Sequence, residues 1–211
     1  MLKPFFVIVS VATLLTINSF ALGKDSEKNT SANLSQFYSG KFGFYSPSNG
    51  LNNGLLIGVD GITEFNKYNF FLSGDIDLYQ KKTFDIFEEP KPNISDQLML
   101  LLPLHINFGY QLAQIPDADT RIYAGIGAGY YLYFYSVTYQ KSSGGLFPSL
   151  TSSSDQKNGG NFFFSIFGRI LIGKIFVEPR YYFATHSEGN VDGNKFLVNP
   201  TGFAITLGFQ Y

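Results

Sequence analysis

Long segments of this sequence alternate strictly between apolar residues and polar or small residues. Between Tyr68 and Tyr79 one set of alternate positions is apolar, with only Gly74 small, whereas the other carries Ser73, Asp75 and Asp77. Successive side chains of a β-strand point to opposite faces, so the pattern predicts strands with two unlike faces. Most of these segments exceed the roughly 5 to 6 residues of an ordinary strand and reach the roughly 9 to 11 residues of a tilted membrane strand.

The alternation recurs often enough to close a barrel. The predicted strands are Phe37–Tyr45, Leu55–Phe65, Tyr68–Tyr79, Leu98–Tyr110, Arg121–Tyr135, Asn161–Ile172, Ile175–His186 and Thr201–Tyr211. The connections between them alternate between short and long. The shorter ones are Asn66–Lys67, Ala113–Thr120 and Gly173–Lys174, and the longer ones are Ser46–Gly54, Gln80–Asp96, Ser136–Gly160 and Ser187–Pro200. This organisation predicts an all-β fold, a transmembrane antiparallel up-and-down β-barrel of about eight strands.

The first residues are expected to lie outside the barrel. Lys3 precedes an apolar run from Phe5 to Ile17, and the small residues Ala21 and Gly23 follow. This order predicts a secretory signal peptide over residues 1–23, because the run is shorter than the roughly 20 apolar residues of a membrane helix. Residues 24–35 are polar and are predicted to form a leader, and residues 36–211 the barrel. The chain has no cysteine, which excludes a lipoprotein anchor, disulfides and thiolate metal sites.

Charge and histidine content exclude several classes of function. The formal net charge is −1, and no basic patch with interleaved aromatic residues is present, so nucleic acid is not an expected partner. The chain holds 2 histidines, His105 and His186, and these are too few and too far apart in sequence to predict a metal site. No cofactor is expected, because Gly125, Gly127 and Gly129 lie inside a strand rather than in a phosphate-binding loop.

Most charged residues of the predicted strands share the face opposite the aliphatic one. In a soluble ligand-binding barrel that polar face would meet water, whereas in a membrane barrel it would line the interior. The membrane reading predicts an interior polar network of Lys41, Asp75, Asp77, Arg169, Glu178 and Arg180, with Asp60, Glu64, His105 and Arg121 on the same face. The inner glycines would leave room for large side chains opposite them. A continuous pore is the less expected outcome, since about eight strands enclose a space that side chains just fill.

Two prolines do not fit regular strands. Pro103 falls on a predicted inner face and Pro179 on a predicted lipid face. Proline removes a ladder donor, so each is expected to mark a bulge or a strand end.

The C-terminal segment resembles the closing strand of small outer-membrane β-barrel proteins. Its alternating apolar positions end in a terminal aromatic residue, and they are Phe203, Ile205, Leu207, Phe209 and Tyr211. The Gly-rich segment Ile122–Tyr130 resembles a central strand of the same group, which includes the opacity-protein and OmpA-type transmembrane domains. The resemblance implies residence in the outer membrane of a Gram-negative-type bacterium, with outer-membrane lipid around the wall. It also implies that the C-terminal strand is the signal read by the barrel-assembly machinery.

One segment carries residue types that are used in catalysis. His186, Ser187 and Glu188 follow one another at the predicted boundary between a strand and an external loop. The region is loosely similar to lipid A deacylases, which are small outer-membrane barrels that use a His, a Ser and an acid. In that family the Ser follows the His by two positions, whereas adjacent residues of a strand point to opposite faces. These residues are therefore weak catalytic candidates.

Three functions remain open from the sequence. The first is a non-enzymatic barrel with a structural and surface-interaction role, whose loop partner is unknown. The second is a conduit for small apolar molecules, and the third is an envelope lipid hydrolase that uses His186.

Overall fold

The computed structural model describes residues 34–48, 50–82, 85–87, 94–142, 150–191 and 193–211. Within them, eight strands form a closed antiparallel barrel in the order β1-β10-β7-β6-β5-β4-β3-β2. The barrel strands are β1 (Leu34–Pro47), β2 (Gly54–Phe65), β3 (Phe70–Lys81), β4 (Ile94–Ile115), β5 (Thr120–Ser142), β6 (Leu150–Ile172), β7 (Ile175–Ala184) and β10 (Gly202–Gln210). Two further strands, β8 (Ser187–Val191) and β9 (Asn194–Val198), pair as a separate hairpin.

The predicted all-β barrel of eight strands is confirmed, and each predicted strand has its counterpart. The predicted signal peptide and nearly all of the leader lie outside the described residues. Strand β1 begins at Leu34, inside the segment predicted to be leader, and β7 ends at Ala184, before His186. Among the described residues there is no helix long and apolar enough to cross a bilayer.

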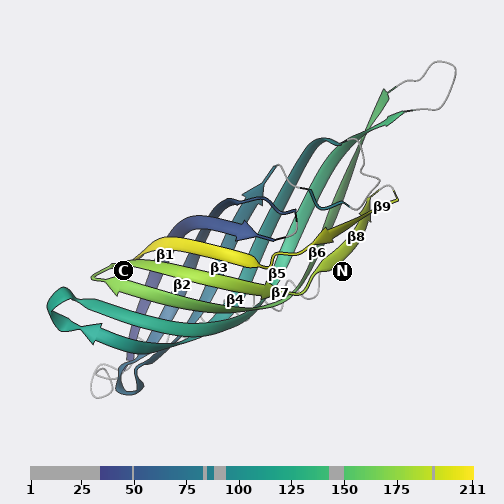
Figure 1. Cartoon of the computed structure of the whole chain (residues 1–211). Coiled ribbons are helices and arrows are strands. Elements are labelled where there is room, and N and C mark those ends of the chain that lie inside the picture. The colour runs from purple at the N-terminus through teal and green to yellow at the C-terminus, as the bar shows by residue number, and fades with distance from the viewer. Residues whose placement is uncertain (1–33, 49, 83–84, 88–93, 143–149, 192) are drawn as a thin grey trace, which may run out of the picture.

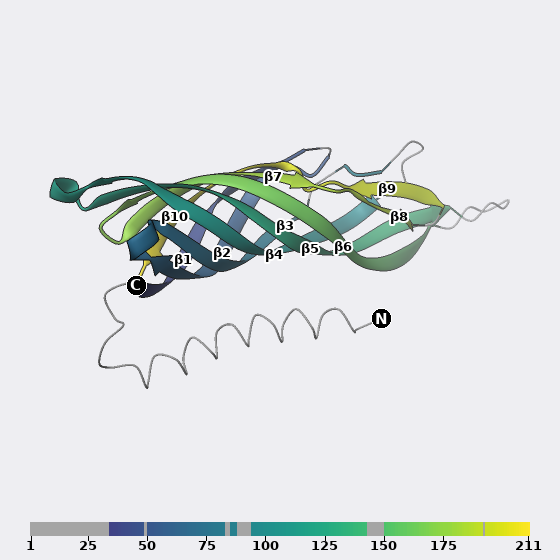
Figure 2. The ribbon, with the colours of Figure 1, turned by 90° about the horizontal axis from the view of Figure 1, so that it is seen from below.

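The short connections gather at one end of the barrel. Strands β2 and β3 are joined through η1 (Asn66–Tyr68), β4 and β5 through η2 (Pro116–Ala118), and β6 and β7 through Gly173 and Lys174. The C-terminus lies at the same end, and the long connections lie at the other end (Figures 1 and 2). Outer-membrane barrels keep short turns on the periplasmic side and long loops outside, so we call the two ends the periplasmic and the external end.

The barrel wall is uneven because β4, β5 and β6 extend far beyond the segments that the alternation predicted. Strands β5 and β6 pair from Thr120↔Ile172 to Ser142↔Leu150, and most of the predicted loop Ser136–Gly160 is therefore β-structure. This hairpin rises beyond the neighbouring strands at the external end (Figure 1). At the periplasmic end β4 continues to Ile115, past its last pair with β3 at Phe70↔Tyr110. The predicted loop Ser187–Pro200 contains the β8–β9 hairpin.

The two prolines lie inside strands, so the prediction of a bulge or strand end at each was wrong. β3 and β4 keep one register from Ile76↔Leu104 to Tyr79↔Leu101, and only the ladder pairs beside Pro103 are missing. β6 and β7 likewise keep their register from Phe167↔Arg180 to Ile170↔Val177 across Pro179. A proline removes one donor, and these strands absorb the loss as a short gap in one ladder. The register shifts of β4 lie elsewhere, at Ile94/Asp96 and Gln111/Ala113.

The polarity of the barrel is the reverse of that of a soluble protein. Aliphatic and aromatic side chains cover its outside; Phe42 is 61% exposed, Ile76 42% and Leu207 43%. Charged side chains such as Asp77 and Glu178 are buried inside. Exposed tyrosines on the outer face near the periplasmic end include Tyr38, Tyr68, Tyr110 and Tyr211. Tyrosines at this level are typical of the interfacial belt of a membrane protein.

Candidate functional site: the barrel interior and its external cap

A layer of charged side chains crosses the interior near the middle of the barrel. We call it the charged layer. Four of the strands supply the six residues of the predicted polar network, and β2 and β4 add one residue each. The members are Lys41 of β1, Asp60 of β2, Asp75 and Asp77 of β3, His105 of β4, Arg169 of β6, and Glu178 and Arg180 of β7. All of them are buried. Glu64 and Arg121 lie apart from the layer, nearer the periplasmic mouth, and Arg121 is only partly buried.

Each cation of the charged layer contacts more than one carboxylate. Lys41 Nζ lies 2.8 Å from Asp75 Oδ2 and 3.1 Å from Asp77 Oδ1. Arg169 Nη2 lies 2.7 Å from Asp60 Oδ2 and 2.6 Å from Glu178 Oε2.

Arg180 and His105 complete the layer. Arg180 donates through Nη2 to Glu178 Oε1 at 2.8 Å and through Nη1 to Asn107 Oδ1 at 2.6 Å. His105 Nε2 lies 3.0 Å from Asp77 Oδ2. The layer is thus one connected network, and such networks fix side chains in a single arrangement when their members are paired.

Glycines on the inner face of β5 leave room for the side chains of the charged layer and its neighbours. A Cβ on Gly127 would lie 2.3 Å from Asn107 Oδ1 and 2.6 Å from Ser165 Oγ. One on Gly125 would lie 2.4 Å from the Phe167 ring. The inner face of β5 is therefore kept free of side chains where groups from β4, β6 and β7 reach across the barrel.

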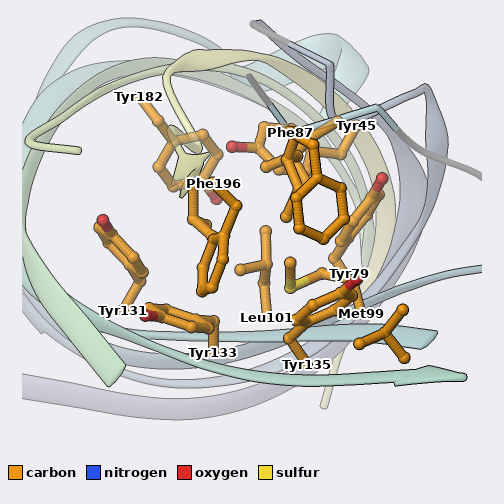
Figure 3. Close-up of a cluster of buried hydrophobic side chains, with 14 of the residues drawn as sticks. Tyr45, Tyr79, Phe87, Met99, Leu101, Tyr131, Tyr133, Tyr135, Tyr182 and Phe196 are labelled. Atoms are coloured by element: carbon orange, nitrogen blue, oxygen red, sulfur yellow. The ribbon is translucent and has the colours of Figure 1, made fainter. Parts of the chain in front are cut away.

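Apolar side chains fill the interior on both sides of the charged layer. On the periplasmic side, Phe37 packs against a cluster of Ile62, Phe71, Tyr123, Phe167, Leu171 and Phe176. On the external side lies a larger cluster rich in tyrosine (Figure 3), whose members include Tyr45, Tyr79, Met99, Leu101, Tyr131, Tyr133, Tyr135, Val137, Phe163 and Tyr182. Buried side chains thus occupy the described interior in successive layers, which explains why the wall holds its shape.

Residues of the external connections close the larger cluster from above. We call them the external cap, which consists of Leu51, Ile86, Phe87, Val191, Phe196 and Val198, all buried. Phe87 and Phe196 lie among the tyrosine rings in Figure 3, with ring centroids 6.1 Å apart. The backbones of these two residues also form a bridge, and Leu197 N donates to Ile86 O at 2.9 Å. The cap therefore joins the β3–β4 connection to the β8–β9 hairpin.

Tyrosine hydroxyls of the wall hold the external connections in place. Tyr131 Oη donates to Thr185 O at 2.6 Å. Tyr79 Oη donates to Asn52 O, and Tyr45 Oη donates to Pro200 O. A buried tyrosine that keeps a polar partner both packs and orients the segment it touches. Sequence reasoning missed these anchors, although Tyr45, Tyr79 and Tyr131 alternate with the aliphatic positions of their strands.

The three catalytic candidates lie at the foot of the β8–β9 hairpin. His186 and Glu188 are exposed, and His186 Nε2 lies 3.4 Å from Glu188 Oε1. Ser187 Oγ lies 3.0 Å from Tyr131 Oη, on the side facing the barrel wall. The imidazole thus pairs with the acid, while the hydroxyl belongs to the tyrosine anchors. An activated serine needs a base within roughly 3 Å, and these positions do not bring the two together.

The five C-terminal apolar residues lie on the outer face of the closing strand. Phe203, Ile205, Leu207 and Phe209 alternate with buried residues of β10, and Tyr211 follows directly. Strand β10 pairs with β1, and the seam ends where Tyr211 N donates to Tyr38 O at 2.9 Å.

Comparison with known proteins gives similarity to solved structures alone. No family model matches the sequence, and no curated protein matches it. The chain is similar to Neisserial surface protein A, with 15% identity, a TM-score of 0.46, and coverage of 84% of this chain and 97% of that one. It is similar to Ail, the attachment invasion locus protein of Yersinia pestis, with 10% identity, a TM-score of 0.45, and coverage of 85% and 99%. The outer membrane protein AlkL matches with 14% identity, a TM-score of 0.36, and coverage of 89% and 96%.

The geometry defines the class of protein. A closed barrel needs no water to satisfy the backbone groups of its wall, and this one places aliphatic groups outside and charges inside. The protein is a small transmembrane β-barrel of the outer-membrane type.

A charge on the outer face at mid-height should prevent stable insertion. Ile76 pairs with Val59 and Leu104 in the middle of the wall. We expect Ile76→Arg to destabilise the barrel folded in lipid, lowering its free energy of unfolding by about 2 to 4 kcal/mol, the cost of arginine at the bilayer midplane. Gln80→Arg, on the same face of β3 at the external end, should cost at most about 1 kcal/mol. Urea titration of the protein folded in vesicles measures both; equal costs would contradict the placement of the membrane.

Proposed function

We propose that the protein is a non-enzymatic surface protein, whose folded external end contacts partners outside the cell. The observation that carries this proposal is the external cap. Its residues come from three separate connections and share one core with the tyrosines of the wall. Binding residues are commonly held on loops by a rigid scaffold. The capped end offers such a scaffold, together with the raised β5–β6 hairpin.

The experiment compares cells that display the protein with cells that display a variant whose β8–β9 hairpin is replaced by a Gly-Ser linker. Both are tested for retention on a panel of immobilised extracellular-matrix proteins and glycans. We expect retention that depends on the protein and is lost with the hairpin. A shift of gel mobility on boiling serves as control, because a closed barrel resists detergent when cold. Equal retention of both cell types would contradict the proposal.

A conduit for small apolar molecules is the second candidate, favoured by the aromatic character of the external half of the interior. Such a molecule would have to displace Phe87 and Phe196 and then leave through the wall, because the charged layer lies below. Uptake of a fluorescent alkane analogue by vesicles containing the protein tests this route. Uptake that rises when the cap is removed would support the conduit over the surface role.

A lipid hydrolase is disfavoured because His186 pairs with Glu188, whereas the hydroxyl of Ser187 contacts Tyr131. Mass spectra of lipid A from cells with the protein and with its His186→Ala variant test this candidate, and we expect identical acylation. The lipid-facing C-terminal residues fit the role of an assembly signal for the barrel-assembly machinery. We include this role in the proposal because Phe209 and Tyr211 lie on the outer face, where a membrane machinery can reach them.

A further inference from the structure

A polar cleft opens on the periplasmic rim, at the end of the barrel opposite the cap. It has a volume of about 340 Å³, close to the lower limit of small-ligand pockets, roughly 300 Å³. It lies between the β2–β3 turn and the projecting β4–β5 hairpin. Its lining comes from the periplasmic ends of β2, β3, β4 and β5 and from the turns between them.

The register of the strands creates this cleft. Strand β3 pairs with β4 only as far as Phe70↔Tyr110, whereas β4 continues beyond it with a register shift at Gln111/Ala113. Asn69, in the left-handed region with φ 56°, turns the chain into β3, and Gln111 N donates to its carbonyl oxygen at 2.7 Å. The β4–β5 hairpin therefore projects beyond the β2–β3 turn, and no strand pairs with β4 along the side of the cleft.

The charges of the lining exclude ions as ligands. Arg121 Nη1 lies 2.8 Å from Glu64 Oε2, and Tyr123 Oη donates to Glu64 Oε1 at 2.9 Å. This pair closes the inner end of the cleft and neutralises itself. Asp119 is the remaining charged group of the lining, so an anion would meet a carboxylate, and a metal ion would meet too few acidic ligands beside a guanidinium.

Most of the other polar side chains that line the cleft are carboxamides. Asn66, Asn69, Gln111 and Gln114 each carry a donor and an acceptor in one plane. Gln111 Nε2 donates to Gln114 Oε1 at 3.3 Å, a long bond at an exposed site that a ligand can replace. Phe65 and Phe70 border the cleft, and their rings stack at 4.5 Å on the outer face of the wall.

We propose that this cleft binds an uncharged N-acetylated sugar. Neighbouring hydroxyls and an acetamido group offer paired donors and acceptors that match the planar carboxamides of the lining. The sugar can come from a soluble oligosaccharide or from a cell-wall glycan on the periplasmic side. The cleft lies at the opposite end of the barrel from the external cap. Sugar binding there is therefore independent of the proposed surface role.

The test titrates N,N′-diacetylchitobiose into the protein in lipid nanodiscs, with amide chemical shifts as readout. We expect saturable shifts at the cleft residues, and binding weaker by about tenfold or more in Gln111→Ala/Gln114→Ala, which lacks two ligand hydrogen-bonding groups. The matched control is Gln156→Ala/Asn158→Ala on β6, at the external end. It should bind as the unchanged protein does. Both variants must shift on boiling in the gel assay, so that loss of fold is not read as loss of binding.

Further binding experiments distinguish a soluble sugar from a cell-wall glycan as the ligand. Sedimentation with purified cell-wall sacculi that is competed by the disaccharide identifies a glycan of the wall, and binding of the disaccharide without sedimentation identifies a soluble sugar. Sedimentation that only a short alanyl peptide competes would overturn the sugar in favour of peptide. Absence of binding to every probe, or equal binding by the Gln111/Gln114 variant, would overturn the site.

Discussion

Arg180→Met should destabilise the barrel more than any surface substitution. We expect it to lower the free energy of unfolding by about 3 to 5 kcal/mol. Arg180 is buried and donates to Glu178, Asn107 and Ser165. Methionine is of similar length but carries no charge, so Glu178 and Asp75 lose a partner in a place that water does not reach. Urea unfolding in vesicles, followed by the mobility shift on boiling, measures the loss.

The matched control removes a cation from an exposed ion pair. Lys157 Nζ lies 3.5 Å from Asp155 Oδ2; Lys157 is exposed and Asp155 is partly exposed. Lys157→Met should change the stability by less than about 1 kcal/mol. Adding Glu178→Gln to Arg180→Met should restore part of the loss, because Asp75 keeps Lys41 at 2.8 Å. A small effect of Arg180→Met alone would mean that the charged layer is hydrated and contributes little to the fold.

The sequence predicts the wall well because two unlike environments demand alternation. Ile76 faces lipid and must be apolar, whereas Asp75 beside it faces the interior and needs a charged partner. The sequence of β3 therefore alternates with a period of two. The same reasoning placed Lys41, Asp77 and Glu178 on the inner face. Which carboxylate meets which cation could not be predicted, since those contacts depend on registers between strands that are distant in sequence.

The external end was harder to predict for a different reason. The segment 151–160 of β6 is polar on both faces, so it carries no alternation, although β5 pairs with it along its length. The β8–β9 hairpin has a local signal that was missed: Asp192-Gly193 separates two short segments that can pair, and Asp-Gly favours a two-residue hairpin turn. No local pattern joins Phe87 to Phe196, because their contact closes a long loop.

Phe196→Ala should open the external end and leave the wall intact. The Phe196 side chain is 1% exposed and its ring lies 5.6 Å from Tyr135 and 6.1 Å from Phe87. Truncating a buried phenylalanine costs about 3 to 5 kcal/mol. The wall has its own ladders and the charged layer, so this cost should fall on the cap. We expect faster hydrogen exchange across β8 and β9 and new protease cleavage there on intact cells, with the gel shift on boiling unchanged.

Phe183→Ala is the control, because Phe183 lies on β7 facing outward and is 49% exposed. It should leave exchange in the hairpin as it is. The pair also separates the two leading functions, since opening the cap removes a binding surface but clears the entrance of a conduit. Loss of cell retention without a gain in uptake by Phe196→Ala supports the surface role. A gain in uptake would instead assign the aromatic cluster to transport, because only a conduit improves when its entrance is cleared.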